Sequence, residues 1–224
     1  MYLNKIGMIA ANTSRTRYYL RELIKHNLKP NYVLVLLNDN EKDLPGQIGS
    51  ETVSEIVDLL KEENFFFEVS PNGNINSKQI KDLLLTREES TFIYSGFGGE
   101  IIKDYILNSG KEFLHIHGGY LPDYKGSTTN YFSLIEENSM GASSIFLTKD
   151  IDCGPILKRK KFPAPKDRTK IDHIYDSKVR AKVLIETLQN YVKKGKFDFE
   201  FNTNIEGETF YIIHPVLKHL AILG

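Results

Sequence analysis

Two histidines, His115 and His117, lie two residues apart at the end of an apolar segment and are the side chains of this sequence best suited to chemistry. Residues 112–117 have the apolar character of a buried strand. Alternate side chains of a strand share a face, so both rings should point the same way. A histidine can donate a hydrogen bond or move a proton, so the pair indicates a site at the end of this strand. The simpler alternative is one packed and one solvated histidine.

A histidine pair of this spacing is also common in the zinc sites of hydrolases. Zinc needs at least one further ligand, and the other histidines of the chain show no matching spacing. They are His26, His173, His214 and His219. We therefore expect no metal, and metal-dependent hydrolysis stays open as an alternative.

A carboxylate follows a later apolar strand, within residues 149–156 (KDIDCGPI). Asp152 precedes a Cys-Gly-Pro turn, and a carboxylate beside a histidine can orient the ring and help to move its proton. Asp150 is expected to be a solvated loop charge. Cys153 is more typical of a small residue that fills a turn than of a thiol nucleophile.

A glycine-rich turn, Gly96 to Gly99, follows the apolar segment 91–94. A dinucleotide site would need a third glycine, where the sequence has Ile101, and the turn after the first predicted strand (AANTSR) holds no glycine. The sequence has no GxxxxGK[ST] motif, so a P-loop nucleotide site is not expected. Either these glycines form a tight turn into a helix, or exposed backbone amides there meet a ligand.

The composition is that of a globular protein. The chain has 224 residues, with 29 Lys plus Arg against 29 Asp plus Glu. Proteins that grip long nucleic acids usually carry a basic surplus, so we expect no nucleic-acid partner. One cysteine allows no disulfide within the chain, and no segment approaches the ~18 apolar residues of a membrane span. We expect a cytoplasmic protein that does not bind membranes.

The elements that position these residues alternate between strand and helix. Strands are predicted over residues 5–10, 32–37, 65–69, 91–94 and 112–117, with helices beginning near 15, 50, 77 and 101. This order predicts an α/β fold with a Rossmann-like, mostly parallel sheet and helices on both faces. Further strands are predicted over 142–148, 156–162 and 209–213, with a long helix over 167–194. We expect one catalytic domain over 1–195, and a tail over 196–224 that packs on the core or forms a homodimer contact.

The motifs together resemble the formyltransferase family that uses 10-formyltetrahydrofolate. The loop HIHGGYLPDYKG is similar to the family's histidine loop at His117, Leu121, Pro122, Tyr124, Lys125 and Gly126. The second family motif ends in Asp-x-Gly-Pro-Ile, which residues 152–156 match. The segment FIYSGFGGEIIKDYIL resembles the folate-side segment. The resemblance covers roughly residues 1–190, with the specific motifs between 91 and 156.

The resemblance implies a metal-free acylation of an amine. His117 would stabilise the oxyanion and return a proton to the leaving folate, and Asp152 would orient His117. His115 stands where the family has asparagine and would supply the second oxyanion donor. Ile145 stands where the family has a further histidine, so activity could be altered, more dependent on pH, or lost. The implied folate-binding residues are Gly96, Phe97, Gly98, Gly99, Ile101 and Ile102.

By elimination within the family, the substrate expected is a small-molecule amine, an amino sugar on a nucleotide carrier. Its binding residues are expected to be Arg15, Tyr120, Tyr124 and Lys125. Arg15 could meet a phosphate near the start of a helix, and the tyrosines could stack on a base or sugar or simply pack. Two alternatives stay open. One is a hydrolase of formyl-folate or a metal-dependent hydrolase on the same scaffold, and the other is a catalytically impaired binding protein.

Overall fold

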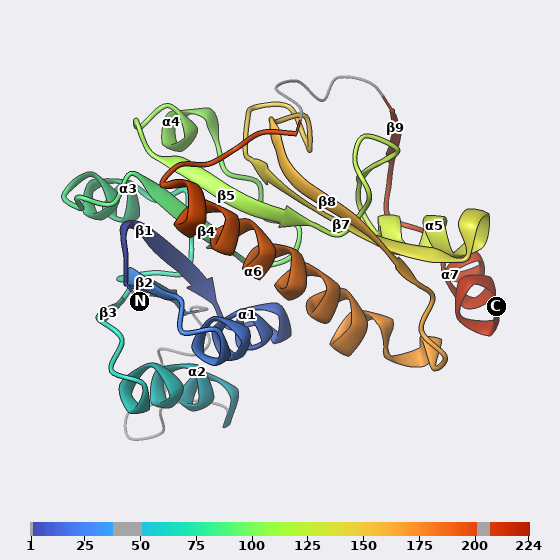
Figure 1. Cartoon of the computed structure of the whole chain (residues 1–224), viewed down its shortest axis with the longest axis horizontal. Helices are drawn as coiled ribbons and strands as arrows, with labels where there is room; N and C mark the ends of the chain where they lie inside the picture. Colours follow the sequence, from blue (N-terminus) through green and yellow to red (C-terminus); the bar gives the residue numbers. More distant parts are fainter. Residues whose placement is uncertain (1, 38–50, 201–206) are drawn as a thin grey trace. The chain divides into compact units, whose positions relative to one another are not determined.

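A seven-stranded sheet organises the protein (Figure 1), in a computed structural model that describes residues 2–37, 51–200 and 207–224. Its strand order is β3 (Phe67–Val69), β2 (Lys29–Leu36), β1 (Tyr2–Ala11), β4 (Thr91–Ser95), β5 (Glu112–His117), β7 (Ser139–Phe146) and β8 (Ile156–Pro163). Parallel pairs join β1 to β2, β1 to β4 and β2 to β3, whereas β8 runs antiparallel to β7. The mostly parallel α/β fold expected from the sequence is therefore confirmed.

The chain divides into two compact units, Met1–Leu114 and His115–Gly224. In the first unit residues 6–11 of β1, residues 32–36 of β2 and all of β4 are buried, as expected when both faces of a parallel strand are covered. The helices of this unit are α1 (Ser14–Lys25), α2 (Glu51–Glu62), α3 (Lys78–Leu85) and the short α4 (Asp104–Leu107). The predicted domain boundary at residue 195 stays a prediction.

Local capping explains where two of these helices begin. The Thr13 side chain accepts a hydrogen bond from the Thr16 amide at the start of α1, and Ser77 does the same for Ile80 at the start of α3. Each cap satisfies an amide that has no partner within its own helix. Ser77 is the cap predicted from the sequence. The predicted cap of α2, Ser50, and the predicted loop over 38–49 lie outside the described residues.

The helix predicted from residue 101 is wrong at its beginning, because α4 covers only Asp104–Leu107. Gly99 adopts a positive φ of 78°. In the segment that follows, the Asn76 side chain forms hydrogen bonds with backbone groups that a helix would pair internally. Asn76 donates to the Ile101 carbonyl and accepts from the Lys103 amide, each at 2.8 Å. The segment before α4 therefore stays extended, with the Ile101 side chain 61% exposed.

The described part of the second unit holds three α-helices, which pack on β7, on β8 or on one another. These are α5 (Thr129–Glu137), α6 (Asp176–Lys194) and α7 (Pro215–Leu223), of which α5 and α7 were not predicted. Helix α6 packs on β7 and β8, α5 packs on β7, and α7 packs on α5 (Figure 1). The long helix predicted from residue 167 begins instead as a 3-10 turn over Arg168–Lys170 and a π-helical turn over Ile171–Tyr175.

A second, two-stranded sheet ties the end of the chain back to the histidine loop. It joins β6 (Tyr124–Gly126) to β9 (Glu208–Phe210) in parallel. The predicted strand over 209–213 is thus shorter than expected. Within the described ranges, no helix is both long and apolar enough to cross a membrane.

Candidate active site

Strand β5 and the turn after β7 bring the three predicted catalytic side chains together. His115 and His117 share one face of β5, as their spacing predicted, and Asp152 lies in the turn that leads to β8. One nitrogen from each histidine and one oxygen of Asp152 all lie within 4.8 Å of one another. His117 and Asp152 are buried, with 4% and 8% exposed surface, whereas His115 is only partly buried. All three belong to the second unit.

The ring of His117 is held at both nitrogens. Its Nδ1 lies 3.2 Å from Asp152 Oδ2, and its Nε2 lies 2.7 Å from the carbonyl oxygen of Tyr124. A carbonyl oxygen can only accept, so Nε2 carries a hydrogen. An ionised carboxylate also only accepts, so Nδ1 of a protonated ring can donate to Asp152 Oδ2. The contact is an ion pair when the ring is protonated.

The turn that carries Asp152 has a specific backbone requirement. Asp152 adopts a positive φ of 53°, a conformation that aspartate and asparagine tolerate better than most residues. A methyl group on Gly154 would lie 1.7 Å from the Phe146 carbonyl oxygen, so only glycine fits there. The Gly126 amide of β6 donates to Asp152 Oδ2 at 2.9 Å. The Asp-x-Gly-Pro sequence thus aims one carboxylate oxygen at both β6 and His117.

Gly119 makes room for the histidine ring. A methyl group at this position would lie 2.6 Å from His117 Nε2 and 2.6 Å from the Tyr124 carbonyl oxygen. Both distances are far shorter than a carbon atom permits. Only glycine at position 119 therefore leaves room for the contact between His117 and Tyr124.

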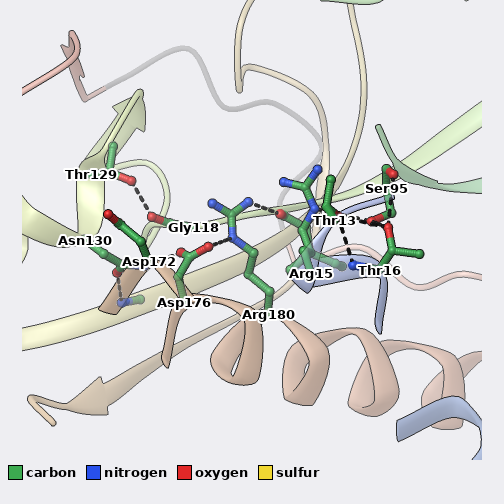
Figure 2. A network of polar contacts seen from close by, with 12 residues as sticks. Thr13, Arg15, Thr16, Ser95, Gly118, Thr129, Asn130, Asp172, Asp176 and Arg180 are labelled. Carbon is green, nitrogen blue, oxygen red and sulfur yellow. Dashed lines mark hydrogen bonds and ion pairs between the residues drawn. The ribbon is translucent and has the colours of Figure 1, made fainter. Parts of the chain in front are cut away.

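A polar network, which the sequence did not reveal, holds the backbone around the two histidines (Figure 2). Arg180 of α6 donates to the Ile116 carbonyl at 2.7 Å and to Asp176 at 2.8 Å. Asn130 of α5 donates to the same aspartate at 3.0 Å and accepts from the Gly141 amide at 2.7 Å. The spacing of Asp176 and Arg180 predicts a pair on one helix face, but not its contact with β5.

The glycine-rich segment after β4 belongs to the first unit and has its own anchor. Arg15 donates to the Gly96 carbonyl and, at 3.3 Å, to the Ser95 hydroxyl (Figure 2). The Thr16 and Ser95 hydroxyls are 2.8 Å apart. Arg15, predicted to meet a substrate phosphate, thus fixes the start of the turn predicted to hold folate, and its contact with a phosphate stays a prediction.

A model of the formyl transferase family matches residues 4–187 of the chain. The chain belongs to this family. The family resemblance seen in the motifs is therefore confirmed, with a match over most of the sequence.

Curated relatives of this formyl transferase carry the name methionyl-tRNA formyltransferase. The protein from Mycoplasmopsis pulmonis is 30% identical over 149 residues, which are 65% of this chain and 48% of that protein. The protein from Sulfurovum sp. is 24% identical over 153 residues, 68% of this chain and 49% of that protein. The chain thus spans about half the length of the curated relatives it matches.

Solved structures with the same fold include N-formyltransferases. An N-formyltransferase from Helicobacter canadensis, in complex with folinic acid and dTDP-3-aminofucose, is 20% identical, with a TM-score of 0.57 over 93% of this chain and 71% of that one. A 4-N formyltransferase from Francisella tularensis is 14% identical, with a TM-score of 0.63 over 98% and 86% of the two chains. At these identities the likeness establishes the fold.

The two positions at which the resemblance implies other residues have different structural outcomes. Ile145 is fully buried and packs with Leu121 and Ile156, so an apolar cluster occupies the position where the resemblance implies a further histidine. His115 keeps its place at the end of β5 beside His117 and Asp152. Only the second departure therefore leaves a group with proton or ligand chemistry in the site.

The predicted substrate-binding residues of the second unit make contacts inside the protein. The Tyr120 ring lies against the Arg159 guanidinium at 4.7 Å and the Lys161 ammonium at 4.9 Å. Tyr124 is buried and its hydroxyl donates to Glu136 at 2.9 Å, and Lys125 is buried too. Burial, with the neighbouring Glu136, raises the pKa of Tyr124, so its hydroxyl stays protonated at neutral pH. Substrate contacts by these residues stay predictions.

Proposed function

We propose that this formyl transferase moves a formyl group from 10-formyltetrahydrofolate to a primary amine. The observation that carries the proposal is the 3.2 Å contact between His117 Nδ1 and Asp152 Oδ2, with His115 beside them. The folinic acid in the Helicobacter canadensis enzyme supports a folate donor. The proposal includes a role for each of these three residues.

In the proposed reaction the amine nitrogen attacks the formyl carbon, and the carbonyl electrons move to its oxygen. His115, the more exposed histidine, donates a hydrogen bond to that oxyanion, a contribution typically worth ~10²–10³ in turnover. The tetrahedral intermediate then breaks its bond to the folate nitrogen. The amine loses a proton, the folate nitrogen gains one, and the His117–Asp152 pair carries it between them.

The His117 ring has a defined step to make in this scheme. Its Nε2 hydrogen rests on the Tyr124 carbonyl. Transfer of this proton requires the folate nitrogen to replace that carbonyl as the acceptor. Asp152 stabilises the charged ring while this happens, because its carboxylate faces Nδ1 at 3.2 Å. Asp152 thus orients the His117 ring and also stabilises the protonated form from which the ring donates its proton.

We further propose that the amine belongs to an amino sugar on a nucleotide carrier. The dTDP-3-aminofucose of the Helicobacter canadensis enzyme supports this class, and the match there covers 93% of this chain. The equal numbers of basic and acidic residues also favour a small substrate over a tRNA. The names of the curated relatives favour the tRNA substrate, so both classes belong in the test.

The test is a formyl-transfer assay with mass spectrometric detection. The protein is mixed with 10-formyltetrahydrofolate and either dTDP-linked amino sugars or aminoacylated initiator tRNA, and the product is sought as a gain of one formyl group. We expect a formylated sugar nucleotide, and we expect turnover to fall by ~10²–10⁴ in Asp152→Asn. Asp150→Asn, at an exposed position in the same turn, is the matched control. A formylated tRNA without sugar product would overturn the substrate class, and free formate with neither would overturn the transferase.

A further inference from the structure

We propose that His115, His117 and Asp152 form a binding site for one divalent metal ion of the zinc class. The proposal concerns the same three side chains as the proposed function, but it does not depend on formyl transfer. The sequence left the histidine pair without a third ligand, because no other histidine had suitable spacing. The structure supplies that ligand as a carboxylate, 35 residues further along the chain than His117.

The distances match those between zinc ligands. Zinc binds histidine nitrogen and carboxylate oxygen at about 2.0–2.2 Å, so tetrahedral ligands lie roughly 3.3 Å apart. His117 Nδ1 and Asp152 Oδ2 are 3.2 Å apart, which already fits. The three ligand atoms all lie within 4.8 Å of one another, so closure of the site needs a ligand movement of at most roughly 1.5 Å.

The hydrogen bonds around the cluster orient it for a cation. His117 gives its Nε2 hydrogen to the Tyr124 carbonyl, so the lone pair of a neutral ring lies on Nδ1 and faces the carboxylate. Two acceptors that face each other at this distance need a positive charge between them, which a proton or a metal ion can supply. Metal-bound histidines commonly donate their other nitrogen to a carbonyl in this way.

The carboxylate has matching support. The Gly126 amide donates to Asp152 Oδ2 at 2.9 Å, and the side chain of Asp152 is 8% exposed. Supporting partners of this kind are typical of metal ligands. Both buried ligands therefore have hydrogen-bond partners in the protein before any ion binds.

His115 completes the set and gives access to it. Its side chain is only partly buried, so an ion can reach the site and a fourth position can remain for water or a substrate atom. Asparagine, the residue of the family motif at this position, is not among the usual zinc ligands. His115→Asn is therefore the variant that removes the proposed metal ligand while restoring the family's residue.

The experiment measures metal content and not turnover, so its failure is distinct from failure of the proposed function. Tag-free protein is stripped with a chelator, titrated with Zn²⁺ by calorimetry, and analysed for bound metal after dialysis. Co²⁺ is used in parallel, because its visible absorption reports the coordination geometry. We expect one ion per chain and a loss of affinity of ~100-fold or more in His115→Asn and in Asp152→Asn. His219→Asn, at an exposed position on α7, should bind as the unaltered chain does.

Circular dichroism and thermal unfolding of each variant without metal establish that it is folded. Folded His115→Asn that binds Zn²⁺ as tightly as the unaltered chain would overturn the proposal. So would the absence of stoichiometric metal in the unaltered chain, which would leave a proton alone between His117 and Asp152. Binding that His219→Asn abolishes would place the ion on the surface of α7 and also overturn it.

Discussion

Arg180 Nη1 lies 2.7 Å from the carbonyl oxygen of Ile116, the one residue that separates His115 from His117. The guanidinium is fixed in turn by Asp176, four residues earlier on α6. A methyl group on Gly118 would lie 2.3 Å from another nitrogen of this guanidinium, so the cation lies directly against the backbone of the histidine loop. The arginine therefore acts as a positioning residue, since it reaches the histidines only through the main chain.

Replacement of Arg180 by methionine should lower kcat by roughly 10–100-fold and leave KM for the amine almost unchanged, because a small displacement of the reacting groups costs rate more than binding. Arg180→Lys should recover part of the loss, since an ammonium can still donate to the Ile116 carbonyl. Steady-state formyl transfer checks both. Lys182→Met, at an exposed position of the same helix, is the control. A rise in KM with unchanged kcat would argue for direct contact with substrate.

Two substitutions at Asp152 distinguish the effect of its charge from the effect of its backbone conformation. Asparagine tolerates the left-handed conformation at φ 53°, whereas alanine pays ~1–2 kcal/mol to adopt it. Asp152→Asn should therefore unfold near the temperature of the unaltered chain while losing activity, and Asp152→Ala should lose both stability and activity. Thermal unfolding followed beside formyl transfer distinguishes them. Equal stability of the two variants would contradict the argument from backbone conformation.

Glu89 is fully buried in the first unit, and we expect it to make the stability of the fold sensitive to acid. It accepts hydrogen bonds from Arg87 at 3.1 Å and from Asn31 at 2.6 Å. Burial alone would raise the pKa of Glu89, but the hydrogen bonds from Arg87 and Asn31 outweigh it and lower that pKa. A depressed folded-state pKa contributes stability above the unfolded value, about 4.3 for glutamate, and this contribution is lost as pH falls through the folded value.

Arg87→Met should accordingly lower the free energy of unfolding by about 3 kcal/mol at pH 7, because it leaves a buried carboxylate without its cation. As the pH falls toward the lowered folded-state pKa of Glu89, the difference between variant and unaltered chain should shrink, since protonation removes the carboxylate charge. Urea unfolding at pH 7 and at pH 3.5 measures the two differences. A constant difference across this range would mean that Arg87 stabilises the fold by packing on Tyr32 and Phe66 and not by charge.

Metal and proton compete for the same atoms if the proposed function and the proposed metal site are both correct. An ion on His117 Nδ1 and Asp152 Oδ2 would occupy the place of a proton between these two atoms. Zn²⁺ should then inhibit formyl transfer reversibly, and a chelator should restore the rate. In His115→Asn the residual activity should be far less sensitive to Zn²⁺. Stimulation by Zn²⁺ would instead show that the ion takes part in the reaction.

The sequence best predicted the features that depend on residues close together in the chain. The spacing of His115 and His117 predicted their common face, and the Asp-Cys-Gly-Pro turn marked Asp152, because strand periodicity and backbone restrictions are local. The same periodicity predicted strand β5 at its observed bounds.

What escaped prediction depends on contacts between distant segments. The bond from Arg180 to Ile116 joins residues 64 apart, and no local pattern reports it. Helix α5 was missed because several of its buried residues are polar, including Asn130 and Ser133, so its apolar period is weak. The extended segment before α4 depends on Asn76, 25 residues upstream of the carbonyl that it holds.

Strand β9, which pairs with β6, is synthesised after all three residues of the candidate site. Strand β6 supplies both the Tyr124 carbonyl that holds His117 and the Gly126 amide that holds Asp152, and its partner strand ends at Phe210. A ribosome delivers both histidines and Asp152 well before it delivers that partner strand. A chain that ends between Asp152 and Glu208 would therefore hold both histidines and Asp152 without the strand that pairs with β6.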